Sequence, residues 1–476
     1  VGYYGGDFVA TLDTSTLEPQ IVIHNEERLY AVLSCYAPDG GQLDFNVTVS
    51  DAFGNKWTKT VKREEQRKAN GSWVYELTLD KLTSGSRFKE LYPNLIPGSD
   101  ITVAFTALSE NDLIDSASAE AKTNSLFDSV EGKKAVITYG RHLQNLDELS
   151  GLNNAKVEIT TAEQRNNLHF DNDEDNREDW YSLYGENAFR PVKNPRLQSY
   201  TGSYTLTDSA AGTDGKIRGI IYGLKTQKGV FDTFYGHQIK DMTLSGIMVT
   251  GGENAGAIAG SIQQSETFSL TGCQVYLDAS EGDLDGKSEK DIWIRGSRHV
   301  GGLVGYVSHD VNIEDSFAAT VLGTEETEYA GGLIGFVQNS LSIENSYADC
   351  YIYGRTAGGL AGRAAEKATT IRNSYAAGYI FSSGKAAGFI PTSAAKMQNA
   401  YAVFSYRQDA AEIYPTAAGG NSAVNVYYIP PAAAFGTPAN TARAIAYADL
   451  SQRDTAAAML GAAFSASTGG SNTTAY

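Results

Sequence analysis

The sequence is poor in cysteine, in proline and in positive charge. Its 476 residues include 3 cysteines, 11 prolines, and 38 Lys and Arg against 56 Asp and Glu, for a formal charge of −18. A chain this acidic lacks the cationic surface that phosphate groups require, so we expect no nucleic-acid partner. No run approaches the roughly 18 uncharged apolar residues of a membrane-spanning helix, so we expect no membrane insertion in this segment.

The three cysteines, Cys35, Cys273 and Cys350, lie far apart and form no CxxC pair. Zinc-ribbon and thioredoxin-type motifs are therefore excluded, and we expect buried free thiols. The chain opens with Val1 instead of Met and shows no signal-peptide pattern, which suggests a processed or truncated chain.

The abundant residues favour β-structure. Glycine occurs 49 times and tyrosine 28 times. Glycine above its usual ~7% suits tight corners between short strands, while tyrosine, valine, isoleucine and threonine favour strands. We therefore predict an all-β protein.

Residues 1–127 are interpreted as an immunoglobulin-like β-sandwich, with a fibronectin-type sandwich as the alternative. Turn signals such as Pro97-Gly98 separate short apolar segments, and Phe45–Val49 alternates apolar and polar residues as a half-exposed strand does. The expected strands are Phe8–Leu12, Ile21–His24, Leu29–Tyr36, Leu43–Ser50, Trp57–Lys62, Trp73–Leu79 and Ile101–Leu108.

Residues 128–215 are interpreted as a transition that leads into, and caps, a repetitive region. A helix is predicted over Thr161–Leu168, because Thr160 and Glu163 have the spacing of a capping box. Two acidic segments follow that superficially resemble calcium loops: Asp171, Asp173 and Asp175, and the inserted Asp283 and Asp285. In the first, Asn176 and Ser182 replace the glycine and glutamate of an EF-hand, so solvated acidic loops are the preferred interpretation.

From residue 216 to 430 the sequence repeats itself with a period near 28 residues. One block, glycine-glycine-leucine-x-glycine in its clearest copies, ends at Gly260, Gly305, Gly335, Gly362 and, in decayed form, Pro391. The first two copies, which end at Gly260 and Gly305, are further apart than the others because a polar insertion over residues 277–291 lies between them. A second block, Asp or Asn followed by a small residue and an aromatic one, keeps the same phase.

Because so short a repeat cannot bury its apolar side alone, its copies must stack as coils about 4.8 Å apart, and equivalent residues then form ladders. Leucine-rich repeats and propellers have other patterns and periods and are excluded. The expected ladders are apolar (Leu303, Leu333, Leu360, Phe389), aromatic (Phe317, Tyr347, Tyr375, Tyr401, Tyr427) and polar (Asp315, Asn345, Asn373, Asn399, Asn425).

The predicted fold of residues 216–430 is a right-handed parallel β-helix. We expect the stacked amides to hydrogen-bond between coils at a corner, and the paired glycines to supply the turn with φ > 0 that closes each rung. Residues 431–476 are interpreted as a C-terminal cap or tail with a short helix over Asp449–Leu460.

The glycine blocks ending at Gly305, Gly335 and Gly362, with Asn-Ser-Tyr-Ala between them, resemble the GLUG-motif repeat family. The segments Ala155–Gln164 and Ile239–Gly246 resemble the first coils of such proteins, so the resemblance covers about residues 136–430. It implies a bacterial secreted or cell-surface protein, adhesin-like or similar to the non-catalytic regions of immunoglobulin A proteases. It implies no catalytic residue.

The sequence contains no catalytic motif. Neither HExxH nor GxSxG occurs, and the closest match to a phosphate-binding loop, at Gly286-Lys287-Ser288, has Glu281 where the first glycine should be. Paired carboxylates for a glycosidase are available at Glu314, Asp315 and Glu344, but a solvated face is the preferred interpretation. We assign no catalytic residue, metal or cofactor.

Aromatic residues near predicted loops are candidates for stacking on a sugar or a protein, with core packing as the preferred interpretation: Trp180, Tyr181, Tyr184 and Trp293. The leading hypothesis is a non-enzymatic bacterial protein, extracellular or at the cell surface, that binds a host or matrix glycan or protein or acts as a spacer. The alternatives are a carbohydrate-active β-helix enzyme, either a glycosidase or a polysaccharide lyase, and a substrate-recognition fragment of a larger surface protease.

Overall fold

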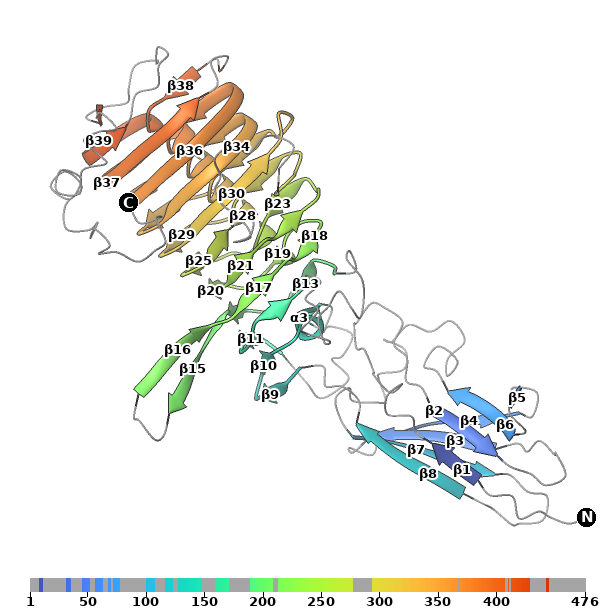
Figure 1. Cartoon of the computed structure of the whole chain (residues 1–476). Coiled ribbons are helices and arrows are strands. Elements are labelled where there is room, and N and C mark those ends of the chain that lie inside the picture. The colour runs from blue at the N-terminus through green and yellow to red at the C-terminus, as the bar shows by residue number, and fades with distance from the viewer. Residues whose placement is uncertain are drawn as a thin grey trace, which may run out of the picture. The chain divides into compact units, whose positions relative to one another are not determined.

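The structure is a computed structural model of the whole chain, and it divides into two compact units, residues 1–136 with 141–159 and residues 137–140 with 160–476 (Figure 1). It describes strands between residues 8 and 122 and then residues 127–144, 146–147, 159–170, 189–208, 213–276, 293–365, 368–406, 410, 412–428 and 442–444. Its regular structure is nearly all β, which confirms the predicted class.

The first unit contains two four-stranded antiparallel sheets, ordered β1-β2-β6-β5 and β4-β3-β7-β8. Six of the seven expected strands are present, and Ile21–His24 lies outside the described residues. β5 and β8 were not expected, and the immunoglobulin-like assignment stays a prediction. The strands are β1 (Phe8–Thr11), β2 (Ala31–Cys35), β3 (Phe45–Asp51), β4 (Lys56–Val61), β5 (Arg67–Ala69), β6 (Ser72–Leu77), β7 (Asp100–Ala107) and β8 (Ser116–Lys122).

The second unit is a β-solenoid of about 8 turns, in which parallel strands of successive coils pair in register. One complete coil contains β27 (His299–Gly301), β28 (Val304–Val307), β29 (Val311–Glu314) and β30 (Phe317–Gly323). Parallel pairing already begins where β11 pairs with β14, within the segment interpreted as a transition.

The remaining solenoid strands belong to the same four walls. The wall of β27 includes β23 (Asn254–Gly256), β31 (Tyr329–Gly331) and β38 (Glu412–Tyr414), and the wall of β28 includes β13 (Val192–Asn194), β19 (Phe231–Phe234), β24 (Ala259–Ile262), β32 (Ile334–Val337) and β35 (Ala361–Ala364). The wall of β29 includes β11 (Thr161–Gln164), β14 (Ser199–Thr201), β20 (Gln238–Lys240), β25 (Phe268–Thr271), β33 (Leu341–Glu344) and parts of the long strands β36 (Thr369–Ala387), β37 (Ile390–Tyr406) and β39 (Ala417–Tyr428). These long strands bend at the corners and continue into the neighbouring walls. The wall of β30 includes β12 (Leu168–His169), β17 (Ile220–Tyr222), β21 (Thr243–Ser245), β26 (Gln274–Tyr276), β34 (Tyr347–Gly358) and β40 (Arg443–Ala444). The other elements are β9 (Ser129–Glu131), β10 (Lys134–Ile137), α3 (Gly140–Gln144), the hairpin β15 (Ser203–Asp208) and β16 (Thr213–Arg218), β18 (Lys225–Thr226) and β22 (Met248–Val249).

The parallel strand pairing continues across the coil that holds the predicted insertion. Ser269 pairs with Asn312 on the next coil, just as Asn312 pairs with Ser342. On the far side of the insertion, Ile294 forms parallel bridges with Val249 and Leu322. The extra residues of this coil therefore leave the register of the strands unchanged.

The helix predicted over Thr161–Leu168 is wrong, because Thr161–Gln164 form β11 and Leu168 begins β12 after a short turn. Along β11 the side chains alternate between half-buried and buried, and Gln164 is fully buried, where it accepts a hydrogen bond from the Tyr200 hydroxyl at 2.7 Å. Glu163 pairs with Arg165 at 2.5 Å instead of capping a helix. Parallel pairing with β14 outweighs a local helix signal, since propensity is a weak preference that tertiary contacts override.

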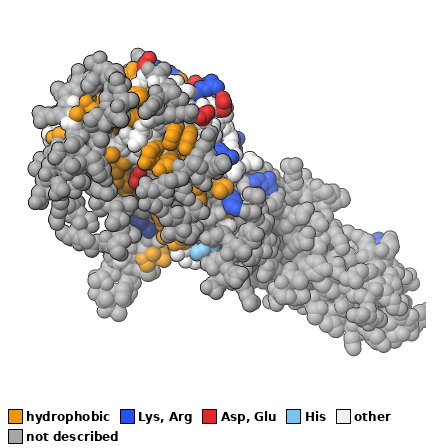
Figure 2. Space-filling view, turned by 45° about the horizontal axis from the view of Figure 1, so that its top comes forward, with side chains coloured by type: hydrophobic (Ala, Val, Ile, Leu, Met, Phe, Trp, Pro, Cys, Tyr) orange, Lys and Arg blue, Asp and Glu red, His pale blue; other side chains and the backbone are white. Residues whose placement is uncertain are grey.

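The predicted apolar and aromatic ladders are both present. Leu303, Leu333, Leu360 and Phe389 are fully buried, and their backbones are hydrogen-bonded in that order from coil to coil. Phe317, Tyr347, Tyr375, Tyr401 and Tyr427 pair in register. The aromatic ladder lies on the outer side of its wall, because each ring precedes an alanine that is buried in the core in the first four coils. Phe317, Tyr347 and Tyr375 are half-buried, whereas Tyr401 and Tyr427 are buried. Figure 2 shows hydrophobic side chains grouped on the face that it draws.

The polar ladder forms the predicted amide hydrogen bonds at a corner. Each asparagine Nδ2 donates to the side-chain oxygen of the preceding coil: Asn345 to Asp315 at 3.2 Å, Asn373 to Asn345 at 3.1 Å, Asn399 to Asn373 at 3.0 Å and Asn425 to Asn399 at 3.1 Å. All five residues have φ between 49° and 55°. Asparagine and aspartate tolerate this left-handed conformation better than other L-residues, so one side chain provides both the turn and the bond.

The predicted role of the paired glycines is wrong, because none of them has a positive φ. They are needed for close approach instead. A Cβ atom at Gly302 would fall on the carbonyl oxygen of Gly332, and one at Gly332 would fall on that of Gly359 and lie 2.6 Å from the Cβ of Ala348. Glycine here lets two strands and two coils meet without side chains between them.

Candidate functional site

The glycine corner brings two outward side chains of each coil together. His299 precedes the corner and Tyr306 follows it, and their ring centroids lie 5.3 Å apart. On the next coil Tyr329 and Phe336 take the same positions, with centroids 5.8 Å apart. Tyr306, Tyr329 and Phe336 are half-buried on this outer surface. We call His299, Tyr306, Tyr329, Phe336 and Arg363 the corner patch.

His299 is the buried member of the corner patch. Its ring stacks on Phe336 at 4.9 Å, and its Nδ1 donates to Asn254 Oδ1 at 2.7 Å, because Asn254 Nδ2 is used in a hydrogen bond to Ser261. Burial, helped by the positive charge of Arg298, lowers the pKa of His299 to about 4. The ring is therefore neutral at pH 7 and acts as a packed aromatic donor, not as a cation.

Arg363 lies at the C-terminal side of the patch, one coil beyond Phe336. Its guanidinium carbon is 5.1 Å from the ring centroids of both Tyr329 and Phe336, a cation–π geometry. Its Nη1 donates to the Tyr329 hydroxyl at 2.7 Å. Two rings and one hydrogen bond therefore hold this exposed cation in a defined orientation.

Beside the patch runs a column of alternating charge. Glu253, Arg298, Glu328 and Arg355 precede the corner on four successive coils. Arg298 lies 2.8 Å from Glu253 and 3.3 Å from Glu328, while Arg355 lies 2.9 Å from Glu326. Like charges in register would repel one another, so the alternation favours this stacking and leaves these cations neutralised.

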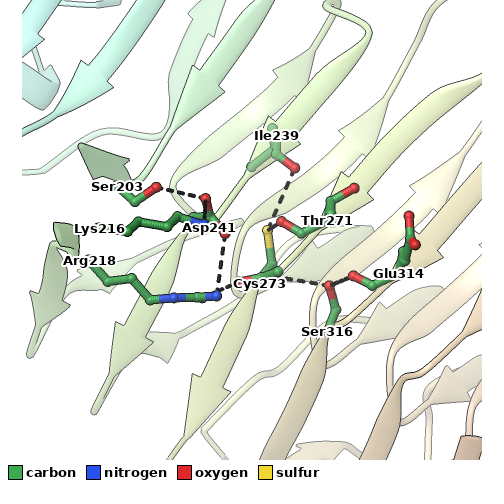
Figure 3. A network of polar contacts seen from close by, with 10 residues as sticks. Ser203, Lys216, Arg218, Ile239, Asp241, Thr271, Cys273, Glu314 and Ser316 are labelled. Carbon is green, nitrogen blue, oxygen red and sulfur yellow. Dashed lines mark hydrogen bonds and ion pairs between the residues drawn. The ribbon is translucent and has the colours of Figure 1, made fainter. Parts of the chain in front are cut away.

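A second polar site fixes the hairpin β15–β16, which projects from the solenoid (Figure 1). The Asp241 carboxylate is buried, with Lys216 Nζ at 2.6 Å, Arg218 Nη2 at 3.4 Å and the Ser203 hydroxyl at 2.7 Å (Figure 3). Burial alone would raise the pKa of Asp241, but the hydrogen bonds from Lys216 and Ser203 and the charges of Lys216 and Arg218 outweigh burial and hold the pKa below its usual value. The network anchors the hairpin at its base.

Two of the three cysteines, Cys273 and Cys350, serve packing, as expected. Cys273 and Cys350 are buried free thiols, and burial raises the pKa of the Cys273 thiol to about 12, which disfavours a reactive thiolate. The backbone N–H of Cys273 donates to the Ser316 hydroxyl at 3.0 Å (Figure 3). The column continues on the next coil, where the backbone N–H of Ser316 donates to the Ser346 hydroxyl at 3.1 Å. The Cys35 side chain lies outside the part that is described.

The carboxylates considered for catalysis do not form a distinct site. Glu314 and Glu344 pair in register on an outer wall, and Glu344 lies 4.0 Å from Arg372. Asp315 adopts φ 50° and accepts the Asn345 amide, so it belongs to the polar ladder. Trp293 is partly buried against Val321, Tyr351 and Tyr353, as the packing interpretation expects.

Several sequence candidates fall outside the described residues: Asp171, Asp173, Asp175, Trp180, Tyr181, Tyr184, Asp283 and Asp285. Within the described part, no group of three or more His, Cys, Asp or Glu side chains is placed to hold a metal ion. No helix among those same residues is long and apolar enough to cross a membrane. Comparisons of the chain with protein-family models, with curated proteins and with solved structures find no match.

The corner patch was not predicted from the sequence, although two copies of the repeat carry a signal for it. Aromatic residues stand two places before the paired glycines, at His299 and Tyr329, and directly after the last glycine, at Tyr306 and Phe336. Only two copies of the block show this signal, since the equivalent positions hold Asn254 and Ser261 in the first copy and Thr356 and Arg363 in the fourth. Their meeting on the outer surface depends on the sharp corner, which spacing alone does not reveal.

Proposed function

We propose that this chain is a non-enzymatic bacterial surface or secreted protein whose solenoid displays the corner patch for adhesin-like binding. The observation that carries the proposal is the placement of Tyr306, Tyr329 and Phe336. The inward residues already fill the core, so aromatic side chains on the outer surface are not required for burial. Partly exposed aromatic and arginine side chains clustered together are typical of binding surfaces.

The aromatic ladder supports the proposal by contrast. Phe317, Tyr347, Tyr375 and Tyr401 stack at 4.6–4.9 Å with interplanar angles of 4–8°. The column continues regularly from coil to coil, and its last two rings, Tyr401 and Tyr427, are buried, so this ladder is a packing device. The proposal includes membership of the GLUG-type repeat proteins, an immunoglobulin-like first domain, and a location outside the cell or at its surface.

A glycan array combined with a panel of host-matrix proteins tests this function. We expect a bound ligand that is lost on Tyr306→Ala with Phe336→Ala, and retained on Glu314→Gln with Glu344→Gln, which changes exposed carboxylates on another wall. Silence across both panels would overturn the binding role and leave only a structural spacer. Release of shortened saccharides by the unaltered chain would point to the enzyme alternative.

A further inference from the structure

The corner patch offers ring edges to solvent more than ring faces. Tyr306 and Phe336 stack with centroids 5.6 Å apart and an interplanar angle of 9°, and Arg363 covers Phe336. A neutral sugar ring binds an aromatic side chain chiefly through its face, and the face of Phe336 towards Tyr306, the face of Tyr306 towards Phe336 and the side of Phe336 under Arg363 are occupied. Ring edges carry partial positive charge, so they favour an electron-rich or anionic group.

The hydrogen-bond donors of the patch point to the same chemistry. Among the residues that the structure describes, no carboxylate pairs with Arg363, whereas Arg298 and Arg355 both have glutamate partners. One N–H of Arg363 is used by the Tyr329 hydroxyl, which leaves most of its five donors and the Tyr329 hydroxyl hydrogen for a ligand. Such a planar fork matches a carboxylate in a bidentate manner.

We propose that the corner patch binds an acidic saccharide, with a uronate carboxylate on Arg363 and the Tyr329 hydroxyl; this rests on the binding function proposed above. The formal charge of −18 opposes a densely charged polymer, so carboxylates separated by neutral sugars fit best. Thr356 pairs in register with Tyr329, and Gln338 accepts a hydrogen bond from Tyr306. These uncharged polar groups suit saccharide hydroxyls.

The test measures the affinity of the whole chain for three probes by calorimetry. The first is a hexasaccharide in which glucuronate alternates with N-acetylglucosamine, the second is its carboxyl methyl ester, and the third is a hexaglutamate peptide. We expect the acid to bind about tenfold or more tightly than the ester, as a charge-assisted bidentate contact implies. Arg363→Gln should weaken binding of the acid to the level of the ester, and Arg363→Lys should recover only part of the loss.

Arg355→Gln is the matched control, because this exposed arginine lies on the same coil but already pairs with Glu326. It should leave the affinity unchanged. Equal affinity for acid and ester, or an unaltered affinity in Arg363→Gln, overturns the carboxylate assignment while the binding function stands. Tighter binding of the peptide than of the hexasaccharide overturns the saccharide class. Binding of no probe overturns the inference, and silence on the glycan and matrix panels then removes the binding function as well.

Discussion

Replacing Asn373 in the middle of the amide ladder separates the two roles of the asparagine corner. Its Nδ2 donates to Asn345 and its Oδ1 accepts from Asn399, and its φ is 49°. Asn373→Gly removes both hydrogen bonds without straining the backbone, so it should lower stability by about 1–2 kcal/mol, at roughly 0.5–1 kcal/mol per half-exposed bond. Asn373→Ala adds a left-handed alanine and should cost about 2–4 kcal/mol in all.

Hydrogen exchange read by mass spectrometry over residues 369–406 is the suitable assay, because it reports the free energy of local opening in these coils. The control is Gln398→Ala, an exposed neighbour of the ladder that should change this free energy by less than about 0.5 kcal/mol. A glycine variant as stable as the wild type would refute the contribution of the amide bonds. Equal losses for glycine and alanine would refute the role of the left-handed backbone.

Three further predictions concern single positions. Gly332→Ala should lower stability in urea denaturation by about 3 kcal/mol or more, because its Cβ would meet the backbone of the next coil. The control Gly251→Ala should be neutral, because its Cβ would meet nothing within 4 Å. A Gly332→Ala variant as stable as the wild type would contradict the close approach of the two coils at Gly332. Asp241→Asn should raise the rate of hydrogen exchange in β15 and β16. In the wild type, the protection of these amides from exchange should be present above pH 3.8 and lost as the pH falls below it, because folding lowers the pKa of Asp241. An unchanged exchange rate in the variant would show that the network does not anchor the hairpin. His299 should destabilise the fold as pH falls from 6.5 towards 4, by up to about 2 kcal/mol at pH 5, because only the unfolded imidazole protonates there. In urea titrations His299→Phe should lack this contribution, and an identical pH dependence in both proteins would refute it.

The coil architecture was predictable from sequence because stacking in register follows from repetition itself. Phe317, Tyr347 and Tyr375 recur at one phase, and parallel coils of equal length must then place their rings over one another. The role of glycine was not predictable in the same way, since a glycine pair is compatible both with φ > 0 and with close approach. Asparagine at the neighbouring corner was the better clue to the left-handed turn.

Local signals failed where a neighbouring coil decides the structure. Thr160 and Glu163 have the spacing of a capping box, yet the partner strand at Ser199–Thr201 lies almost 40 residues further along and leaves no local trace. The corner patch was missed for a related reason. The spacing of the repeat places His299 and Tyr306 on one coil, but it does not show that the glycine corner brings their outward rings together.

The amide ladder also gives the solenoid a polarity. Every amide dipole is aligned, and the row begins at Asp315, whose carboxylate can only accept and so compensates the positive pole. A chain that folds from its amino end adds, with each asparagine, a donor to an acceptor already in place. Growth one rung at a time therefore gives the side-chain amide of each new asparagine an acceptor as soon as it is added, and within the described residues the row ends at Asn425.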